Sequence, residues 1–254
     1  MTAAERPAGA PVYERIGRTY ARTRRADRRI AARITDGLGA ARSVLNIGAG
    51  TGNYEPRDRS VVALEPSSVM LEQRVPGSAP AVRGSCEAVP FADATFDAAM
   101  AILTMHHWLD LEAGIAEMQR VSARQVVLAF EPNMLVDFWL MDYFPEMRDL
   151  PTERRAPRVD RLVELLGGTA SVEPVPVPAD CTDGFGGAFW NRPERYLEPE
   201  VQRNTSNLAQ LEPSVLARGN ARLRADLDSG AWDRRYGSLR ALDEYEMGYR
   251  LIVA

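Results

Sequence analysis

The sequence predicts an α/β fold: a doubly wound, mainly parallel sheet whose last strand is antiparallel, with an added helical cap. Apolar runs alternate with helical segments through the first half of the chain, and a glycine-rich turn follows the first run. Near-continuous apolar runs are typical of parallel strands covered on both faces. Their alternation with helices indicates βαβ units with right-handed crossovers. The 254 residues, 45% of them hydrophobic, suffice for a full core, so we expect one domain.

The elements of the first half follow in order. Residues 13–39 predict one or two helices, with Ile30, Ile34 and Leu38 on one face and Gly39 as the stop. Because ligands bind beyond the carboxyl ends of the strands in such sheets, the strand ends are where we look for a site. Strands are expected at residues 43–47, 61–65, 97–103 and 125–131, and helices between them at 67–74 and 111–121.

The second half of the chain has a different pattern. We expect an amphipathic helix at 158–168, a strand at 170–179 and a last strand at 246–254. A structureless loop as long as the segment between these two strands is improbable in a compact domain, so that segment predicts helices forming a cap. The single domain, 1–254, divides into an N-terminal helical segment (1–40), a ligand-binding core (41–180), a cap insert (181–243) and the last strand (244–254).

Composition and charge exclude several functions. The net charge of −4 and the pI near 5.4 come without a run of like charges, so we expect no nucleic acid and no membrane as partner. The chain has no lysine, which excludes Schiff-base lysine chemistry and a Walker-type phosphate lysine. Its two cysteines, Cys86 and Cys181, are too far apart to indicate a disulfide framework or a zinc site. No stretch approaches the roughly 18 apolar residues that cross a bilayer, so we expect a soluble, cytoplasmic monomer or homodimer.

The stretch LNIGAGTGNYE places Gly48, Gly50 and Gly52 directly after the first predicted strand. Glycines at alternate positions allow a tight turn and a close approach of the backbone to a ligand. Their G-x-G-x-G spacing differs from the G-x-G-x-x-G pattern of dinucleotide sites, which argues against a nicotinamide or flavin cofactor. Glu65 ends the next strand, where a carboxylate can accept two hydrogen bonds from a ribose diol. The alternatives are a plain tight turn and a solvent-exposed carboxylate.

Several motifs together resemble a known family. The stretches VLNIGAGTG, VVALEPSSVML, GSCEAVPFADATFDAAMAILTMHHW and EMQRV are similar, in order and separation, to motifs of class I S-adenosylmethionine-dependent methyltransferases. The closest resemblance is to the ubiquinone/menaquinone-methyltransferase-like branch, methyltransferase type 11, over roughly residues 40–131. It implies a Rossmann-like fold, S-adenosyl-L-methionine as cofactor and 41–180 as the cofactor-binding core.

The resemblance also implies a set of cofactor-binding residues. The glycine loop would line the methionine and ribose, Glu65 would hold the ribose hydroxyls, and the residues after it would flank the adenine. Asn46 and Ser85 depart from the family, which usually has an acidic residue at the first position and often Asp at the second. From the N-terminal segment, Arg24 either pairs with the methionine carboxylate or is one of many solvated arginines. The full set is Tyr20, Arg24, Asn46, Gly48, Ala49, Gly50, Thr51, Gly52, Glu65, Pro66, Met70, Ser85, Cys86, Glu87, Leu103 and Thr104.

His106 and His107 follow the strand at 97–103, at the sheet edge where the methyl group should lie. In an extended corner adjacent side chains point to opposite sides, so one of the two can enter the pocket. We expect this to be His106, as a catalytic base or as a hydrogen-bonded wall residue. His107 is expected to pack beneath the cofactor loop with Trp108. No metal is expected, because neighbouring histidines rarely share one ion and the chain has no third histidine.

The methyl acceptor should be a small molecule held by aromatic side chains of the cap. Each candidate could equally be a core residue. The candidates are Tyr13, His106, Phe138, Tyr143, Phe185, Trp190 and Arg192.

The predicted activity is therefore methyl transfer to an O, N or C atom of a small, partly apolar molecule such as a specialised metabolite. Such a transfer needs alignment and exclusion of water rather than a side-chain nucleophile. The alternatives are a cofactor-binding relative that does not methylate, such as a cyclase, and a binding module on the same fold.

Overall fold

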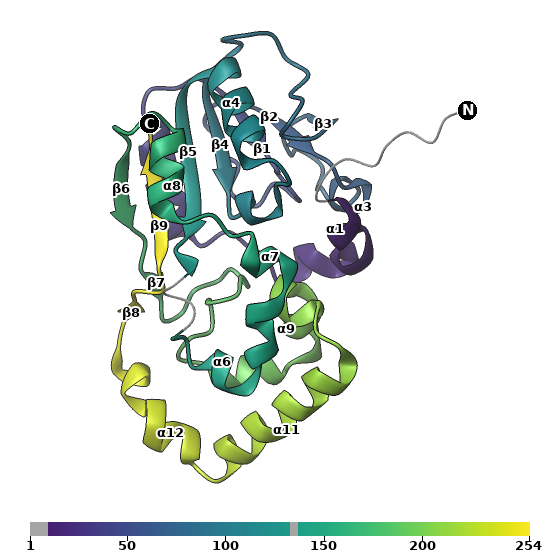
Figure 1. Ribbon diagram of the computed structural model, residues 1–254, viewed down its shortest axis with the longest axis vertical. Coiled ribbons are helices and arrows are strands. Elements are labelled where there is room, and N and C mark those ends of the chain that lie inside the picture. The colour runs from purple at the N-terminus through teal and green to yellow at the C-terminus, as the bar shows by residue number, and fades with distance from the viewer. Residues whose placement is uncertain (1–9, 133–136) are drawn as a thin grey trace, which may run out of the picture.

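A computed structural model describes residues 10–132 and 137–254 of the chain (Figure 1). Its main sheet has seven strands in the order β3-β2-β1-β4-β5-β9-β6. The strands from β3 to β5 run parallel, and β9 is antiparallel to both of its neighbours. The predicted α/β class with an antiparallel last strand is confirmed. The strands are β1 (Ser43–Ile47), β2 (Ser60–Glu65), β3 (Ala81–Arg83), β4 (Phe96–Ile102), β5 (Ser122–Phe130), β6 (Ser171–Pro174) and β9 (Tyr249–Val253).

Two details of the sheet differ from the prediction. The edge strand β3 was not predicted, because it has three residues and none of them is buried. The strand expected at 170–179 is split into β6, which ends at Pro174, and β7 (Val177–Pro178), with Pro176 between them. Proline donates no backbone hydrogen bond, so alternate prolines interrupt a ladder. After this break the chain leaves the main sheet, and β7 pairs with β8 (Glu244–Tyr245).

Helices cover both faces of the sheet, as expected for a doubly wound fold. Helix α2 (Arg28–Leu38) begins at its N-cap Asp27 and buries the predicted face Ile30, Ile34 and Leu38. Helices α4 (Leu111–Val121) and α8 (Val159–Leu165) pack in the second hydrophobic cluster, on the opposite face. The segment before α2 forms α1 (Ala10–Ile16) and the 3-10 helix η1 (Gly17–Arg22), and α3 (Ser68–Leu71) follows β2.

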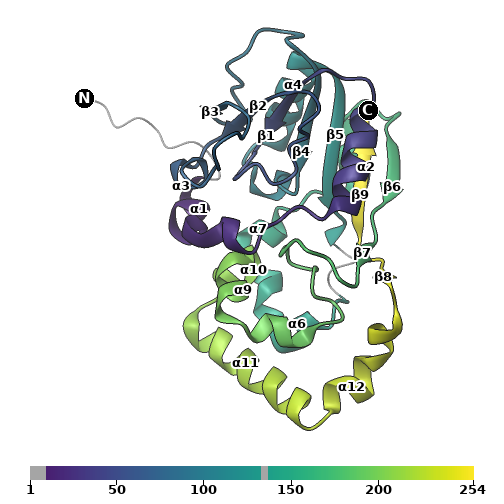
Figure 2. The same cartoon turned by 180° about the vertical axis from the view of Figure 1, so that it is seen from behind.

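The cap lies beyond the carboxyl ends of the parallel strands (Figures 1 and 2). It includes three helical segments, α6, η3 and α7, that fall inside the range assigned to the core from the sequence. Gly219 lets α11 approach Phe144, because a Cβ there would overlap with the Phe144 ring. The cap helices are α6 (Leu140–Tyr143), η3 (Pro145–Asp149), α7 (Pro151–Arg154), η4 (Pro193–Leu197), α9 (Pro199–Asn204), α10 (Ser206–Ala209), α11 (Pro213–Asp228), α12 (Ala231–Tyr236) and η5 (Gly237–Ala241).

Within the described ranges, no helix combines the length and apolar character needed to cross a membrane.

Candidate active site

The main cavity opens at the carboxyl ends of β1, β2 and β4 and encloses about 830 Å³, part of it open to solvent. Thirteen of the sixteen predicted cofactor residues line it: Tyr20, Arg24, Asn46, Gly48, Ala49, Gly50, Thr51, Glu65, Pro66, Met70, Cys86, Leu103 and Thr104. Tyr13, Asn53, Tyr54, Ile102, His107 and Trp108 complete the wall.

The glycine loop needs its glycines for two reasons. Gly48, Gly50 and Gly52 have φ of 68°, 54° and 85°, a region that side chains other than glycine rarely adopt. A Cβ on Gly48 would also lie 2.9 Å from Thr104 Cβ and closer still to its Oγ1. Gly48 and Gly50 therefore line the cavity without a side chain of their own.

Glu65 lies on the cavity wall with 4% of its surface exposed. Its Oε2 accepts a hydrogen bond from Gly50 N at 2.7 Å, and its Oε1 accepts one from Ser67 N at 2.8 Å. Burial raises its pKa, and these two backbone bonds oppose the rise. Each oxygen keeps a free lone pair, so the carboxylate can still accept a ligand hydroxyl.

Asn46 replaces an acidic residue, but a carboxylate lies beside it. Its Nδ2 donates to Glu55 Oε1 at 3.2 Å. Glu55 is in turn paired with Arg74 at 2.7 Å, and both side chains are 7% exposed. The negative charge is therefore present near Asn46 but neutralised by a buried arginine. Asn53 adds a buried Nδ2 without a hydrogen-bond partner in the described chain, on the wall of the main cavity.

Gly52, Ser85 and Glu87 do not reach the wall of the main cavity. The Ser85 hydroxyl donates to the Glu87 carboxylate, which also accepts a bond from Leu109 N at 3.2 Å. These bonds join the loop after β3 to the segment after β4, and Cys86, between the two residues, lines the cavity. Gly52 is instead enclosed by the side chains of Glu55 and Arg74.

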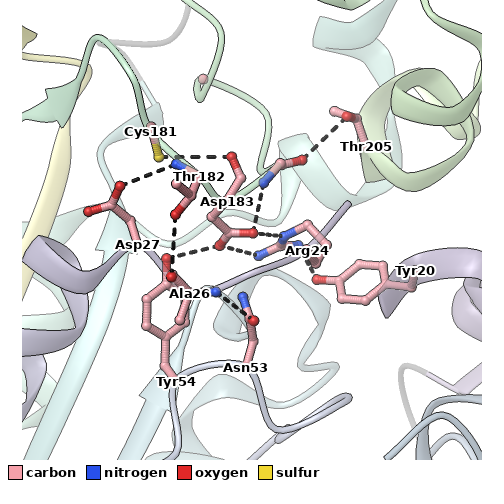
Figure 3. A network of polar contacts seen from close by, with 12 residues as sticks. Tyr20, Arg24, Ala26, Asp27, Asn53, Tyr54, Cys181, Thr182, Asp183 and Thr205 are labelled. Carbon is pink, nitrogen blue, oxygen red and sulfur yellow. Dashed lines mark hydrogen bonds and ion pairs between the residues drawn. The ribbon is translucent and has the colours of Figure 1, made fainter. Parts of the chain in front are cut away.

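Arg24 is buried in a polar network that joins three distant segments (Figure 3). Its Nε and Nη2 donate to the two carboxylate oxygens of Asp183 at 2.6 and 3.2 Å, and its Nη1 donates to the Tyr20 hydroxyl. Tyr54 OH and Gly184 N also donate to Asp183, at 2.9 and 2.8 Å. Burial lowers the pKa of Arg24, but the Asp183 carboxylate outweighs this effect and raises it well above its usual range.

The interpretation of Arg24 as a solvated arginine is therefore wrong. Its side chain is 10% exposed, and its carboxylate partner Asp183, at 0%, was not identified from the sequence. The available signal was an isolated acidic residue in the apolar, glycine-rich stretch CTDGFGGAFW of the cap. A buried carboxylate in such surroundings needs a cationic or hydrogen-bonding partner.

The two histidines face different cavities. They lie in η2 (Met105–His107), a 3-10 turn, with ring centroids 3.9 Å apart. His107, expected beneath the glycine loop, lines the main cavity itself, and its Nε2 is 3.0 Å from Tyr13 OH. Burial, helped by the charge of Arg24, lowers the pKa of His107 to about 4. Trp108 packs on Gly114 of α4, where a Cβ would lie 2.6 Å from the indole.

His106 lines a side cavity of about 490 Å³, which is also partly open. The side cavity shares Tyr13, Arg24 and Leu103 with the main cavity, so the two spaces have a common wall. Leu103 has a positive φ of 53°, a strained conformation for a leucine, at this wall. The remaining residues of the side cavity are Phe130, Glu153, Phe185, Gly186, Ser206, Asn207 and Tyr249.

Comparisons with known proteins agree with this geometry. A family model described as a methyltransferase domain matches residues 45–130. A demethylmenaquinone methyltransferase of Mycolicibacterium paratuberculosis is 31% identical over 173 residues, which cover 64% of this chain and 73% of that protein. The chain belongs to the class I S-adenosylmethionine-dependent methyltransferases.

Two further relatives support the assignment of this methyltransferase. A ubiquinone/menaquinone biosynthesis C-methyltransferase of Geotalea uraniireducens is 30% identical, over 42% of this chain and 54% of that protein. A crystal structure from Anabaena variabilis, described as a methyltransferase from an antibiotic biosynthesis pathway, is 34% identical with a TM-score of 0.85. That match covers 91% of this chain and 98% of the Anabaena protein.

S-adenosylmethionine is the cofactor of the family, and the main cavity fits it. The glycines Gly48 and Gly50 on the wall, the free lone pairs of Glu65 and the Nδ2 of Asn53, unpartnered in the described chain, suit a ligand with hydroxyl and carboxylate groups. Among the described residues, no cluster of histidine, cysteine and carboxylate side chains could hold a metal ion.

The acceptor residues were harder to predict. Tyr13, His106 and Phe185 line the side cavity, whereas Phe138, Tyr143, Trp190 and Arg192 line neither cavity. These four stabilise the cap instead. Phe138 is 6% exposed in the core, and the polar groups of the other three bond within the cap: Tyr143 OH to Asp226, Trp190 Nε1 to Val177 O and Arg192 Nη2 to Cys181 O.

Proposed function

We propose that this methyltransferase transfers a methyl group to an O, N or C atom of a small, partly apolar molecule bound in the side cavity. The observation that carries the proposal is the wall common to the two cavities, at Tyr13, Arg24 and Leu103. The two cavities are therefore adjacent, and a cofactor in one would lie next to an acceptor in the other at these residues. S-adenosylmethionine, when bound, supplies both the methyl group and a good leaving group.

The main cavity would hold the cofactor through its backbone and a few polar groups. Glu65 would accept hydrogen bonds from the ribose hydroxyls, and Asn53 Nδ2 and Arg24 would donate to the methionine carboxylate. Met70 and Cys86, both buried on the wall, would give the adenine an apolar surface.

His106 would contact the acceptor as a neutral imidazole. Burial, with smaller effects from His107 and Arg24, lowers its pKa well below the usual 6.5. A neutral ring can donate or accept one hydrogen bond, but a base with so low a pKa is poorly matched to proton removal near neutral pH. His106 is thus better suited to orienting the acceptor than to deprotonating it.

The chemical class of the acceptor follows from the lining and from one relative. Aromatic rings and a few polar groups surround the side cavity, as in sites for partly apolar metabolites. The Anabaena protein, which is described as acting in antibiotic biosynthesis, supports a specialised metabolite. The negative net charge supports a small acceptor rather than nucleic acid.

Titration calorimetry with S-adenosylhomocysteine tests the cofactor part. The wild type should bind, and Glu65→Ala should lose at least about tenfold in affinity, since a hydrogen bond to a charged group contributes about 1.5–3 kcal/mol. Glu72→Ala, which removes an exposed carboxylate directly after α3, is the matched control and should bind as the wild type does. Absence of binding to the wild type at millimolar ligand would refute the proposal.

Mass spectrometry tests the reaction. A product heavier than the acceptor by one methylene distinguishes methyl transfer from a cyclase-like reaction. If the protein were instead a binding module on the same fold, Glu65→Ala would leave its function intact. Neither alternative is favoured, because the relatives with 30% identity or more that we compared are named as methyltransferases.

A further inference from the structure

Glu153 is a carboxylate of the cap that faces the side cavity. It lies on α7, which packs against η2, the turn that carries His106. The neighbouring Thr152 is 5% exposed and accepts a hydrogen bond from Gln210, so the helix is anchored on its other side. Glu153 and His106 therefore line the same cavity from two elements that pack together.

Glu153 is half-buried, and it differs from the buried carboxylates Glu65 and Asp183 because it has no partner in the described chain. In residues 10–132 and 137–254, its carboxyl group makes no hydrogen bond and no ion pair. Glu65 and Asp183, in contrast, each accept at least two bonds. Burial alone raises the pKa of Glu153 to about 7. An unpartnered carboxyl group that faces a cavity is available to a ligand.

Among the other ionisable groups that line the side cavity in the described chain, Arg24 is the one that is charged near neutral pH. His106, from η2, is neutral because burial, with smaller effects from His107 and Arg24, lowers its pKa. Arg24, which follows η1, stays charged and is paired with Asp183. Burial raises the pKa of Tyr13, from α1, and of Tyr249, from β9, so both phenols stay protonated. Among the described residues of this cavity, Glu153 is the group that can exchange a proton between pH 6 and 8.

We propose that Glu153 is the proton acceptor of the reaction and that the methyl acceptor carries a phenol-type hydroxyl group on a flat ring. This inference rests on the proposed function. When the acceptor oxygen takes the methyl group, the carbon–sulfur bond of the cofactor breaks with its electron pair left on sulfur. The O–H bond of the acceptor breaks at the same time, and its proton passes to the Glu153 carboxylate.

The surroundings favour a neutral hydroxyl over a protonated amine. Burial, with smaller effects from His107 and from Arg24 in the wall, lowers the pKa of His106, so this space disfavours a positive charge. Phe185 and Tyr249 meet edge to face at 4.9 Å between ring centroids, and Phe130 lies 5.3 Å from the His106 ring. Aromatic surfaces at such angles accept a flat ring well.

The test uses protein saturated with S-adenosylhomocysteine and 2-naphthol as the probe. Calorimetry at pH 8 should show that the wild type binds 2-naphthol at least about tenfold more tightly than 2-methoxynaphthalene, which lacks the hydroxyl donor. Glu153→Gln should lose about tenfold in affinity for 2-naphthol and none for the ether. Glu164→Gln, an exposed glutamate of α8 paired with Arg161, is the matched control and should behave as the wild type.

The pH dependence adds a readout that a merely structural role would not change. The wild-type affinity for 2-naphthol should fall as the pH drops below about 7, because Glu153 then takes up its own proton. The affinity of Glu153→Gln should stay constant from pH 6 to 8.

Three results would overturn the inference. They are no binding of 2-naphthol to the wild type at millimolar concentration, an equal loss for 2-naphthol and its ether in Glu153→Gln, and tighter wild-type binding of 2-naphthylmethylamine than of 2-naphthol. Unchanged affinity of Glu153→Gln for S-adenosylhomocysteine would show that the variant is folded. If the wild type does not bind S-adenosylhomocysteine, the proposed function fails; if it binds and the naphthol results fail, only the role of Glu153 does.

Discussion

The ion pair between Arg24 and Asp183 should be one of the strongest single interactions between the cap and the N-terminal segment. Its two N–O distances are 2.6 and 3.2 Å, and its side chains are 10% and 0% exposed. Removing one member of such a pair leaves the other charge buried, at a cost of about 3–5 kcal/mol. We expect Arg24→Met and Asp183→Asn each to lower the free energy of unfolding by about this amount.

A double-mutant cycle separates the pair from its surroundings. The double variant, which has no buried charge left, should be little less stable than either single variant, giving a coupling energy of about 3 kcal/mol. Urea denaturation of the four proteins measures it. The exposed pair Arg158–Asp160, with side chains 57% and 64% exposed, is the control and should couple by less than about 1 kcal/mol. Additive effects of the Arg24 and Asp183 substitutions, within about 0.5 kcal/mol, would refute the reasoning.

Two further predictions concern stability. Burial raises the pKa of Glu153 from 4.5 to about 7, so the ionised carboxylate destabilises the folded protein, and this cost grows as the pH rises from about 4.5 to 7. In urea denaturation, Glu153→Gln should therefore be more stable than the wild type by about 3 kcal/mol at pH 8 and equally stable at pH 4. The same stability difference at both pH values would show that burial of the ionised carboxylate is not the cause. Gly48→Ala should cost at least about 2 kcal/mol, because it combines a positive φ of 68° with an overlap against Thr104. Gly237→Ala, where the nearest atom to a Cβ would be 3.7 Å away, should change the melting temperature little, and equal effects of the two alanines would contradict this explanation.

The sheet and most of the cofactor wall could be predicted because their signals are local. Gly48 and Glu65 each stand at the end of an apolar strand, and parallel strands bring such ends to one edge. The short strand β3 gave no such signal, since an exposed three-residue edge has no apolar run.

The side cavity could not be predicted in the same way. Glu153, Asn207 and Tyr249 come from α7, α10 and β9, and only the packing of the cap brings them together. None of the three lies in a motif. The aromatic density of the cap instead pointed to Trp190, which is fully buried, because large apolar side chains are more often needed for a core than for a ligand.

The partners of the buried carboxylates distinguish structural groups from those available to ligands. Asp183 accepts hydrogen bonds from Arg24, Tyr54 and Gly184. Arg24 neutralises its charge, and the three donors together leave it little capacity to bind a ligand. In the part of the chain that the structure describes, Glu65 accepts bonds from two backbone N–H groups, which hold it in place while its other lone pairs remain free for a diol. Glu153 has no partner in the described chain, so its protonation depends on burial alone and responds to whatever enters the cavity. A carboxylate in this last situation destabilises the protein unless a ligand bonds to it, and for that reason it is the one whose removal should raise stability and lower affinity together.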